Sequence, residues 1–148
     1  MIVNKTKQEA LIKKASQIST SILKKIGKEV REGITPVELD VKAGILCRER
    51  SVKPAFKRVK GYDFNTCISV NDVAVHGIPS NTPLKKGDLV SIDFGIIHKG
   101  MYTDHCWTWS LGRPSKENKL LIDAGREAVE NCIPLAITGN HTGDLGYE

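Results

Sequence analysis

Apolar residues in the first part of the chain recur at the spacing of a helix. Within 10–26 they stand one, three and four positions apart, which is typical of an amphipathic helix with one buried face. The pattern predicts a helix from about Thr6 to Val30. We expect Gly27 to bend or weaken it and Gly33 to end it, because glycine is a poor helix former and a frequent helix terminator.

A second helix is predicted directly after this turn. Thr35 can cap a helix with its hydroxyl oxygen, Pro36 suits the first helical position, and Glu38 completes a capping box. The helix should therefore run from Pro36 to about Glu49.

The pattern changes in 62–112, where Val, Ile, Thr, Trp and Tyr are interrupted by Gly, Pro and Asn. Such segments are typical of short strands separated by turns. They predict three strands and a turn at His98-Lys99-Gly100, the strands being Cys67–Val70, Leu89–Ile97 and Met101–Leu111. A helical pattern returns after Ser115.

The end of the chain resembles an earlier segment. Gly139–Leu145 has a glycine six positions before a leucine and an acid just before that leucine, as does Gly33–Leu39, 106 positions earlier. Each segment follows a long helical pattern. The few identities are compatible with chance; if the repeat is real, a second copy of the unit begins where the sequence stops.

Composition and charge exclude several classes of protein. The chain has 148 residues, 5% aromatic residues and a formal net charge of +5, so it fits one domain and lacks the aromatics of a nucleic-acid stacking platform. Basic residues of Lys13–Arg31 fit the solvated face of a helix better than a binding arm. The four cysteines form no Cys-x-x-Cys pair, which argues against zinc ribbons and thioredoxin-like sites. Without an apolar leader or spanning segment, we expect reduced thiols in the cytosol.

Two aspartates interrupt segments otherwise suited to buried strands. Asp93 and Asp104 lie on either side of the predicted turn. A His98-Lys99 turn would place them directly opposite each other, and a Lys99-Gly100 turn would make them diagonal neighbours, about 5–8 Å apart on one face in either case. A three-residue turn would place them on opposite faces.

Two carboxylates on one face repel each other, so something should offset them. A shared proton or a divalent cation would do so, whereas the plainer alternative is a pair of exposed aspartates near loop ends. His76 ends an apolar run before Gly77 and is a candidate functional imidazole, although a lone histidine is more often structural. His98 and His141 fit exposed turns and receive no role.

Four strings give the sequence a family resemblance. Four segments follow one another in the order and spacing of type I methionine aminopeptidases: the turn Gly33–Asp40, then Cys67–Pro79, Leu84–Asp93 and Gly100–Asp104. The resemblance covers essentially all 148 residues. His-Gly-Ile-Pro combined with the two aspartates is its most specific part.

The resemblance implies an α/β fold of the pita-bread type, with two similar halves. Residues 1–148 would be the N-terminal portion of one catalytic domain, an antiparallel sheet covered by helices, and the C-terminal half would be absent. The family removes the initiator methionine from nascent chains with two divalent metal ions and a bridging water. Asp93 and Asp104 would be metal ligands, His76 would contact the substrate and stabilise the developing oxyanion, and Tyr62 and Cys67 would lie near the methionine pocket.

The resemblance also shows what the chain lacks. The family's other ligands, one histidine and two glutamates, belong to the C-terminal half, so we expect weak or no occupancy by Co, Mn, Fe or Zn and little activity alone. The loop 56–61 is more basic than the corresponding loop of the family, so the resemblance does not determine the details of the methionine pocket. His105 replaces a small hydroxyl residue and is either an extra ligand or, more in keeping with its position, a surface residue.

The expected partner is the N-terminal methionine of nascent peptides, in the cytoplasm and near the ribosome, with no membrane and no sequence-specific nucleic acid. An inactive half-fold serving as a binding module is the first alternative. Another pita-bread peptidase, such as an X-Pro enzyme, is the second, and the string Val75–Pro79 argues against it. A half-domain would also expose an apolar face and associate.

Overall fold

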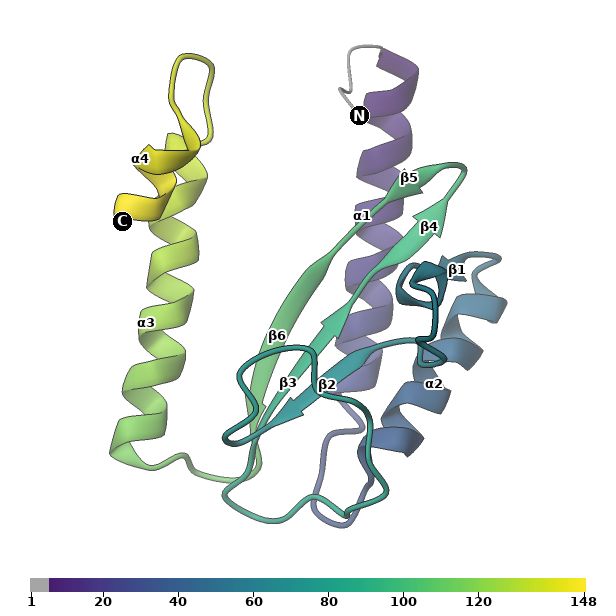
Figure 1. Ribbon diagram of the computed structural model, residues 1–148, viewed down its shortest axis with the longest axis vertical. Helices are drawn as coiled ribbons and strands as arrows, with labels where there is room; N and C mark the ends of the chain where they lie inside the picture. Colours follow the sequence, from purple (N-terminus) through teal and green to yellow (C-terminus); the bar gives the residue numbers. More distant parts are fainter. Residues whose placement is uncertain (1–5) are drawn as a thin grey trace. The chain divides into compact units, whose positions relative to one another are not determined.

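The computed structural model describes residues 6–148. The chain divides into two compact units, Met1–Gly112 and Arg113–Glu148. The described part of the first unit contains two helices, a short 3-10 turn and six strands (Figure 1). In chain order these are α1 (Thr6–Gly27), α2 (Pro36–Glu49), β1 (Lys53–Pro54), η1 (Phe56–Arg58), β2 (Cys67–Val70), β3 (Leu89–Phe94), β4 (Ile96–His98), β5 (Met101–Tyr102) and β6 (His105–Ser110).

Helix α2 has the predicted bounds and the predicted cap. The Glu38 backbone N–H donates to the Thr35 hydroxyl over 3.2 Å, and the Thr35 backbone N–H donates to the Glu38 carboxylate over 2.7 Å. Helix α1 ends earlier than predicted, at Gly27 rather than near Val30. A β-carbon at Gly27 would lie 2.2 Å from the Trp109 ring, so glycine allows the end of α1 to approach β6.

The strands form two antiparallel sheets with the orders β2-β3-β6 and β1-β4-β5. Asp93 pairs with Cys106 and Ile97 pairs with Tyr102, so one register runs through both sheets. This is the register of a Lys99-Gly100 turn, where both residues have positive φ, 48° and 83°. The three-residue turn that would have separated the aspartates is absent from this hairpin.

The hairpin is interrupted where the sequence predicted continuous strands. Gly95 separates β3 from β4, and Thr103 and Asp104 separate β5 from β6. A β-carbon at Gly95 would lie 2.3 Å from the Thr103 carbonyl oxygen, and the Thr103 hydroxyl accepts from the Ile96 backbone N–H over 3.1 Å. This close crossing bends the hairpin without changing its register.

The core of the first unit lies between the sheets and the helices. Val90, Ile92 and Phe94 of β3 are fully buried, and they alternate with residues that face away from the core, as expected for a strand with two different faces. Helix α1 contacts α2, β3, β4 and β5 (Figure 1). The buried apolar residues form one cluster, which fixes the helices on one side of the sheet.

The second unit consists of α3 (Lys116–Cys132), η2 (Ile133–Leu135) and α4 (Thr142–Tyr147). The Ser115 hydroxyl caps α3 by accepting from the Asn118 backbone N–H over 3.1 Å. Within the described residues, no side chain of α3 is buried, and several large apolar side chains of this unit are more than half exposed: Leu120, Leu121, Val129, Ile133, Ile137 and Tyr147. These side chains give the second unit an exposed apolar surface.

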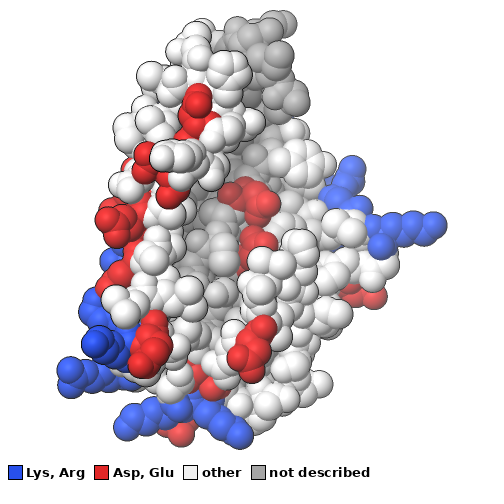
Figure 2. Space-filling view, turned by 60° about the vertical axis from the view of Figure 1, so that its left-hand side comes forward, with Lys and Arg blue, Asp and Glu red and all other residues white. Residues whose placement is uncertain are grey.

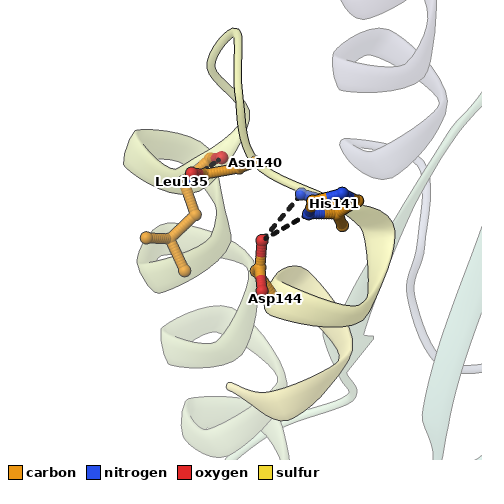
Figure 3. A network of polar contacts seen from close by, with 4 residues as sticks. All are labelled: Leu135, Asn140, His141 and Asp144. Carbon is orange, nitrogen blue, oxygen red and sulfur yellow. Dashed lines mark hydrogen bonds and ion pairs between the residues drawn. The ribbon is translucent and has the colours of Figure 1, made fainter.

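The cap of α4 reproduces the cap of α2. His141 takes the place of Thr35, and Asp144 takes the place of Glu38 in a second capping box, 106 positions later in the chain. Figure 3 shows His141 beside Asp144, whose carboxylate accepts from the His141 backbone N–H over 2.7 Å. The preceding glycine has a positive φ in both turns. The geometry therefore supports the repeat, and it gives His141 a structural role that the sequence did not indicate.

Candidate functional site

One face of the sheet β2-β3-β6 is polar. Residues directly opposite each other in antiparallel strands share a face, and side chains alternate along each strand. The register therefore places one set of side chains on the side opposite the core, and we call this set the polar face: Cys67, Ser69, Ser91, Asp93, Asp104, Cys106 and Thr108. The hydroxyls of Ser91 and Thr108 lie 2.7 Å apart, as this register requires.

Asp93 and Asp104 come together on the polar face as predicted. Asp104 lies opposite Gly95 in the continued register, which makes it a diagonal neighbour of Asp93. Burial, and after it the neighbouring Asp104 carboxylate, raises the pKa of Asp93 to about 6. The unfavourable environment of two close carboxylates is the condition that a bound cation relieves.

His76 is brought toward these carboxylates by unusual backbone geometry. The Gly77 carbonyl oxygen accepts from the Ile68 backbone N–H over 2.8 Å, and the Gly77 backbone N–H donates to the Ser69 hydroxyl over 3.1 Å. These bonds hold the segment along the edge of β2. His76 itself is exposed and has a positive φ of 56°, a strained conformation that is common at functional sites. Its imidazole counteracts the raised pKa of Asp93, so the two groups lie within electrostatic reach.

Tyr62 and Cys67 form a weakly polar wall at the same edge of the sheet. The Tyr62 hydroxyl donates to the Thr66 carbonyl oxygen over 2.7 Å and lies 3.3 Å from the Cys67 sulfur. Burial raises the pKa of both groups above their usual ranges. Both side chains are therefore neutral at pH 7, which suits contact with an apolar or thioether group.

Asp40 holds the residues that precede Cys67 in place, and the sequence did not indicate this role. The carboxylate, 4% exposed, accepts from the backbone N–H groups of Asn65 and Thr66 over 2.8 and 2.9 Å. It also accepts from both of their side chains, each over 2.8 Å. The only signal in the sequence is an acid within the apolar face of α2, beside Leu39 and before Ala43. Asp40 ties α2 to the residues that precede β2.

His105 faces the core, so the expectation that it is a surface residue was wrong. It is half-buried on the core side of β6, where its Nδ1 lies 3.5 Å from the Ser19 hydroxyl and its ring meets that of Phe94 at 6.3 Å between centroids. Burial lowers the pKa of His105. Strand alternation explains the error, because Asp104 and Cys106 face outward and the residue between them must face inward.

The polar face supplies oxygen donors for a divalent metal, but only part of a ligand set. Within residues 6–148, no group of three or more His, Cys, Asp and Glu side chains is gathered closely enough to hold a metal ion. Carboxylate oxygens fit Mn²⁺ and similar cations, so Asp93 and Asp104 suit the metal chemistry without completing it. Figure 2 shows acidic and basic side chains interspersed on the face that it presents, with no broad basic surface there.

Gly77 offers a direct test of how His76 is positioned. A β-carbon at this residue would lie 2.3 Å from the Ile68 carbonyl oxygen, so Gly77→Ala should push the segment away from β2. We expect a loss of about 1–3 kcal/mol of stability and a changed imidazole NMR signal for His76. Urea unfolding and histidine NMR measure both effects.

Gly125→Ala is the matched control, because nothing lies within 4 Å of a β-carbon added there. This helical position should be stabilised slightly, by up to about 1 kcal/mol. If Gly77→Ala changed neither stability nor the His76 signal, the close packing of this segment on β2 would be contradicted.

Known proteins resemble this chain over most of its length. The sequence profile of Metallopeptidase family M24 matches residues 10–148. The chain is 38% identical over 141 residues to a methionine aminopeptidase of Aquifex aeolicus and 36% identical over 149 residues to one of Clostridium perfringens. These matches cover 90% and 100% of this chain but only 55% and 60% of the relatives. The chain thus spans little more than half the length of these relatives.

Solved structures give the same result. The methionine aminopeptidase of Thermotoga maritima matches with a TM-score of 0.86 and 31% identity, covering 93% of this chain and 55% of that one. A methionine aminopeptidase from Streptococci matches with a TM-score of 0.89 and 28% identity, covering 99% of this chain and 64% of that one. The prolidase of Pyrococcus furiosus, at 22% identity and a TM-score of 0.75, covers 89% of this chain and 38% of that one and shares the fold alone. The predicted pita-bread α/β fold is confirmed.

Proposed function

The chain belongs to metallopeptidase family M24, and we propose that it is the part of a methionine aminopeptidase that supplies two carboxylate ligands and the substrate-facing histidine. The observation that carries the proposal is the placement of Asp93 and Asp104 on one face, with His76 within electrostatic reach. The activity, removal of an N-terminal methionine from nascent peptides, belongs to the complete site.

In this proposal, Asp93 and Asp104 hold divalent metal through their carboxylate oxygens. The metals, when bound, supply Lewis acidity and a water of lowered pKa. The specific metals among Co, Mn, Fe and Zn are part of the proposal. The expectation that two carboxylates alone bind metal weakly follows from the small ligand count.

His76 contacts the substrate rather than the metal in this scheme. Its exposed imidazole lies at the edge of the polar face, where an N–H donor could bond to a peptide carbonyl oxygen as negative charge develops on it. Such a donor is typically worth about 10²–10³ in rate. The backbone bonds of Gly77 would hold the imidazole in place before substrate arrives.

Tyr62 and Cys67 line the methionine side-chain pocket in the proposal. Their neutral hydroxyl and thiol offer a polarizable surface to a thioether, and Asp40 anchors the segment between them through Asn65 and Thr66. A nascent-chain substrate also leads us to propose a cytoplasmic location near the ribosome. Among the described residues, no helix is both long and apolar enough to span a membrane.

An X-Pro peptidase is the second candidate function, because prolidases share the fold. The relatives reported above favour the methionine enzyme, since their names and their higher identities agree. An inactive half-fold that acts as a binding module is the third. The exposed apolar side chains of the second unit are the observation in its favour.

The test of the proposed function measures methionine released from Met-Ala-Ser in the presence of Mn²⁺ or Co²⁺. We expect little or no turnover from residues 1–148 alone, because the ligand set is incomplete. We expect turnover when these residues are joined to the unmatched C-terminal part of the Aquifex aeolicus enzyme. The chimera carrying Asp93→Asn is the matched control and should be inactive.

Three results would count against the proposal. Robust turnover by the chain alone would contradict the incomplete site. Cleavage of Ala-Pro in preference to Met-Ala-Ser would favour an X-Pro enzyme. A folded chimera that cleaves neither peptide would favour the binding module, with circular dichroism and urea unfolding used to establish that it is folded.

A further inference from the structure

Asp104 stands at the break between β5 and β6, where one regular hydrogen bond of the hairpin is replaced. In an antiparallel ladder, the two residues of a hydrogen-bonded pair exchange both of their N–H to carbonyl bonds. Ile96 and Thr103 are such a pair, because the Thr103 backbone N–H donates to the Ile96 carbonyl oxygen over 3.0 Å. The bond in the other direction differs. The Ile96 backbone N–H donates to the Thr103 hydroxyl over 3.1 Å, and thus to the side chain where a regular ladder uses the carbonyl.

The Thr103 carbonyl is turned out of the ladder and lies close to Gly95. A β-carbon at Gly95 would lie 2.3 Å from the Thr103 carbonyl oxygen, so a side chain at this position would force the two strands apart. The Gly95 carbonyl oxygen is itself held outside the hairpin, where it accepts from the Ala55 backbone N–H over 2.9 Å. The turned carbonyl belongs to the planar peptide that joins Thr103 to Asp104. Its orientation therefore sets the backbone from which the Asp104 side chain projects.

The replaced bond lies in the core, where water does not substitute for a lost partner. Ile96 is fully buried and Thr103 is 9% exposed. A buried N–H without a partner is costly, so the hydroxyl is needed as long as the carbonyl is turned away. Asp104, the next residue, is exposed. A hydrogen bond on the core side of the hairpin thus determines the backbone of a residue on the polar face.

We propose that Thr103 is a positioning residue for Asp104. By taking the place of its own carbonyl in the ladder, the Thr103 hydroxyl fixes the peptide that carries Asp104, and so sets how the Asp104 carboxylate approaches Asp93. Thr103 acts from the opposite face of the hairpin, because side chains alternate along a strand. The consequence for catalysis rests on the proposed function, in which the two aspartates bind metal.

Substitutions of Thr103 separate the hydroxyl from the size of the side chain. Valine keeps the shape of threonine and lacks the hydroxyl, whereas serine keeps the hydroxyl and lacks the methyl group. In the chain of 148 residues, we expect the NMR signals of the Ile96 and Asp104 backbone amides to shift in Thr103→Val. They should stay close to their original values in Thr103→Ser. If circular dichroism shows that valine prevents folding, Thr103→Ala replaces it in the comparison with serine.

Leu46→Val is the control for a loss of stability alone. Leu46 is 4% exposed and belongs to the buried apolar cluster, so the smaller side chain should lower the urea midpoint by weakening the packing around α2. It should leave the Asp104 amide signal in place. An Asp104 signal that is unchanged in Thr103→Val, or that shifts as much in Leu46→Val or Thr103→Ser, would overturn the inference.

The chimera with the C-terminal part of the Aquifex aeolicus enzyme tests the consequence for the site. We expect Thr103→Val to weaken Mn²⁺ binding about tenfold, the lower end of the effects seen when residues behind metal ligands are replaced. The kcat for Met-Ala-Ser should fall by a similar factor with a smaller change in KM, because the substrate contacts remain. Thr103→Ser should retain both the Mn²⁺ affinity and kcat.

The failure of this inference differs from the failure of the proposed function. If the unaltered chimera is active and Thr103→Val matches it in Mn²⁺ affinity and kcat, the proposed function stands and the positioning role is overturned. If the unaltered chimera neither binds Mn²⁺ nor cleaves Met-Ala-Ser, the proposed function fails, and the NMR comparison alone supports or overturns the placement of Asp104 by Thr103. A shifted Asp104 signal together with weaker Mn²⁺ binding, both absent from the serine variant, is the supporting result.

Discussion

Replacing Asp93 by Asn should remove most divalent metal binding from the chimera in which the C-terminal part of the Aquifex aeolicus enzyme completes the site. Groups around a metal usually change its affinity about 10–100-fold, so losing a carboxylate ligand should weaken Mn²⁺ binding by about 100-fold or more. Isothermal titration with Mn²⁺ measures the affinity. Asp72→Asn is the matched control, because Asp72 is an exposed aspartate of the loop after β2.

The same substitution should stabilise the metal-free chain at neutral pH. The pKa of Asp93 is raised to about 6, above that of an aspartate in an unfolded chain, so the folded protein binds this proton more tightly. The ionised carboxylate therefore costs stability above pH 6, and the cost disappears as the pH falls through 6 toward the unfolded pKa. Asparagine removes this dependence.

Urea unfolding between pH 4 and pH 8 in the presence of EDTA tests the predicted gain of stability and its pH dependence. A metal-binding loss accompanied by lower stability would point to misfolding rather than to a lost ligand. Unchanged metal binding in Asp93→Asn would remove the central premise of the proposed site.

Replacing Asp40 by Asn should cause a large loss of stability. The asparagine amide would turn an N–H donor toward the Asn65 side chain, which already donates to this carboxylate over 2.8 Å. Buried groups left without a partner cost about 1–3 kcal/mol each, so we expect a total loss of about 2–4 kcal/mol. A lower urea midpoint measures it. Faster alkylation of Cys67 should follow, because the residues before β2 would loosen.

Asp88→Asn is the control for Asp40. The Asp88 carboxylate also accepts two hydrogen bonds, from the Asn71 side chain and the Lys85 backbone, over 2.9 and 2.8 Å. It does so near the surface, where water replaces a lost partner, and we expect a loss below about 1 kcal/mol. Similar losses for both variants would show that burial of Asp40 is not what makes its bonds important.

Much of the hairpin could be predicted because local chemistry determines it. The sequence left the His98-Lys99 and Lys99-Gly100 turns as alternatives, and Gly100 suits the positive φ that the second of them requires. Such a turn sets the register for every later pair. The relation between Asp93 and Asp104 follows from that register alone. Helix α2 was equally predictable, because Thr35, Pro36 and Glu38 act within one turn of each other.

Long-range contacts explain what the sequence did not indicate. The bonds of Asp40 join residues 25 and 26 positions away, and no local pattern specifies such partners. Gly27, at the end of α1, packs closely against Trp109, far along the chain. The interruption at Gly95 lies where the Thr103 carbonyl oxygen approaches closely, and a run of apolar residues does not reveal such a contact.

The alternation along β3 separates two kinds of selection within one strand. Substitutions at Val90, Ile92 and Phe94 alter the packing against the helices, whereas substitutions at Ser91 and Asp93 alter the chemistry on the other side. Adjacent residues of β3 are thus constrained differently, one by packing in the core and the next by the chemistry of the polar face. A substitution on the outward-facing side can therefore change the chemistry there while the packing beneath remains unchanged.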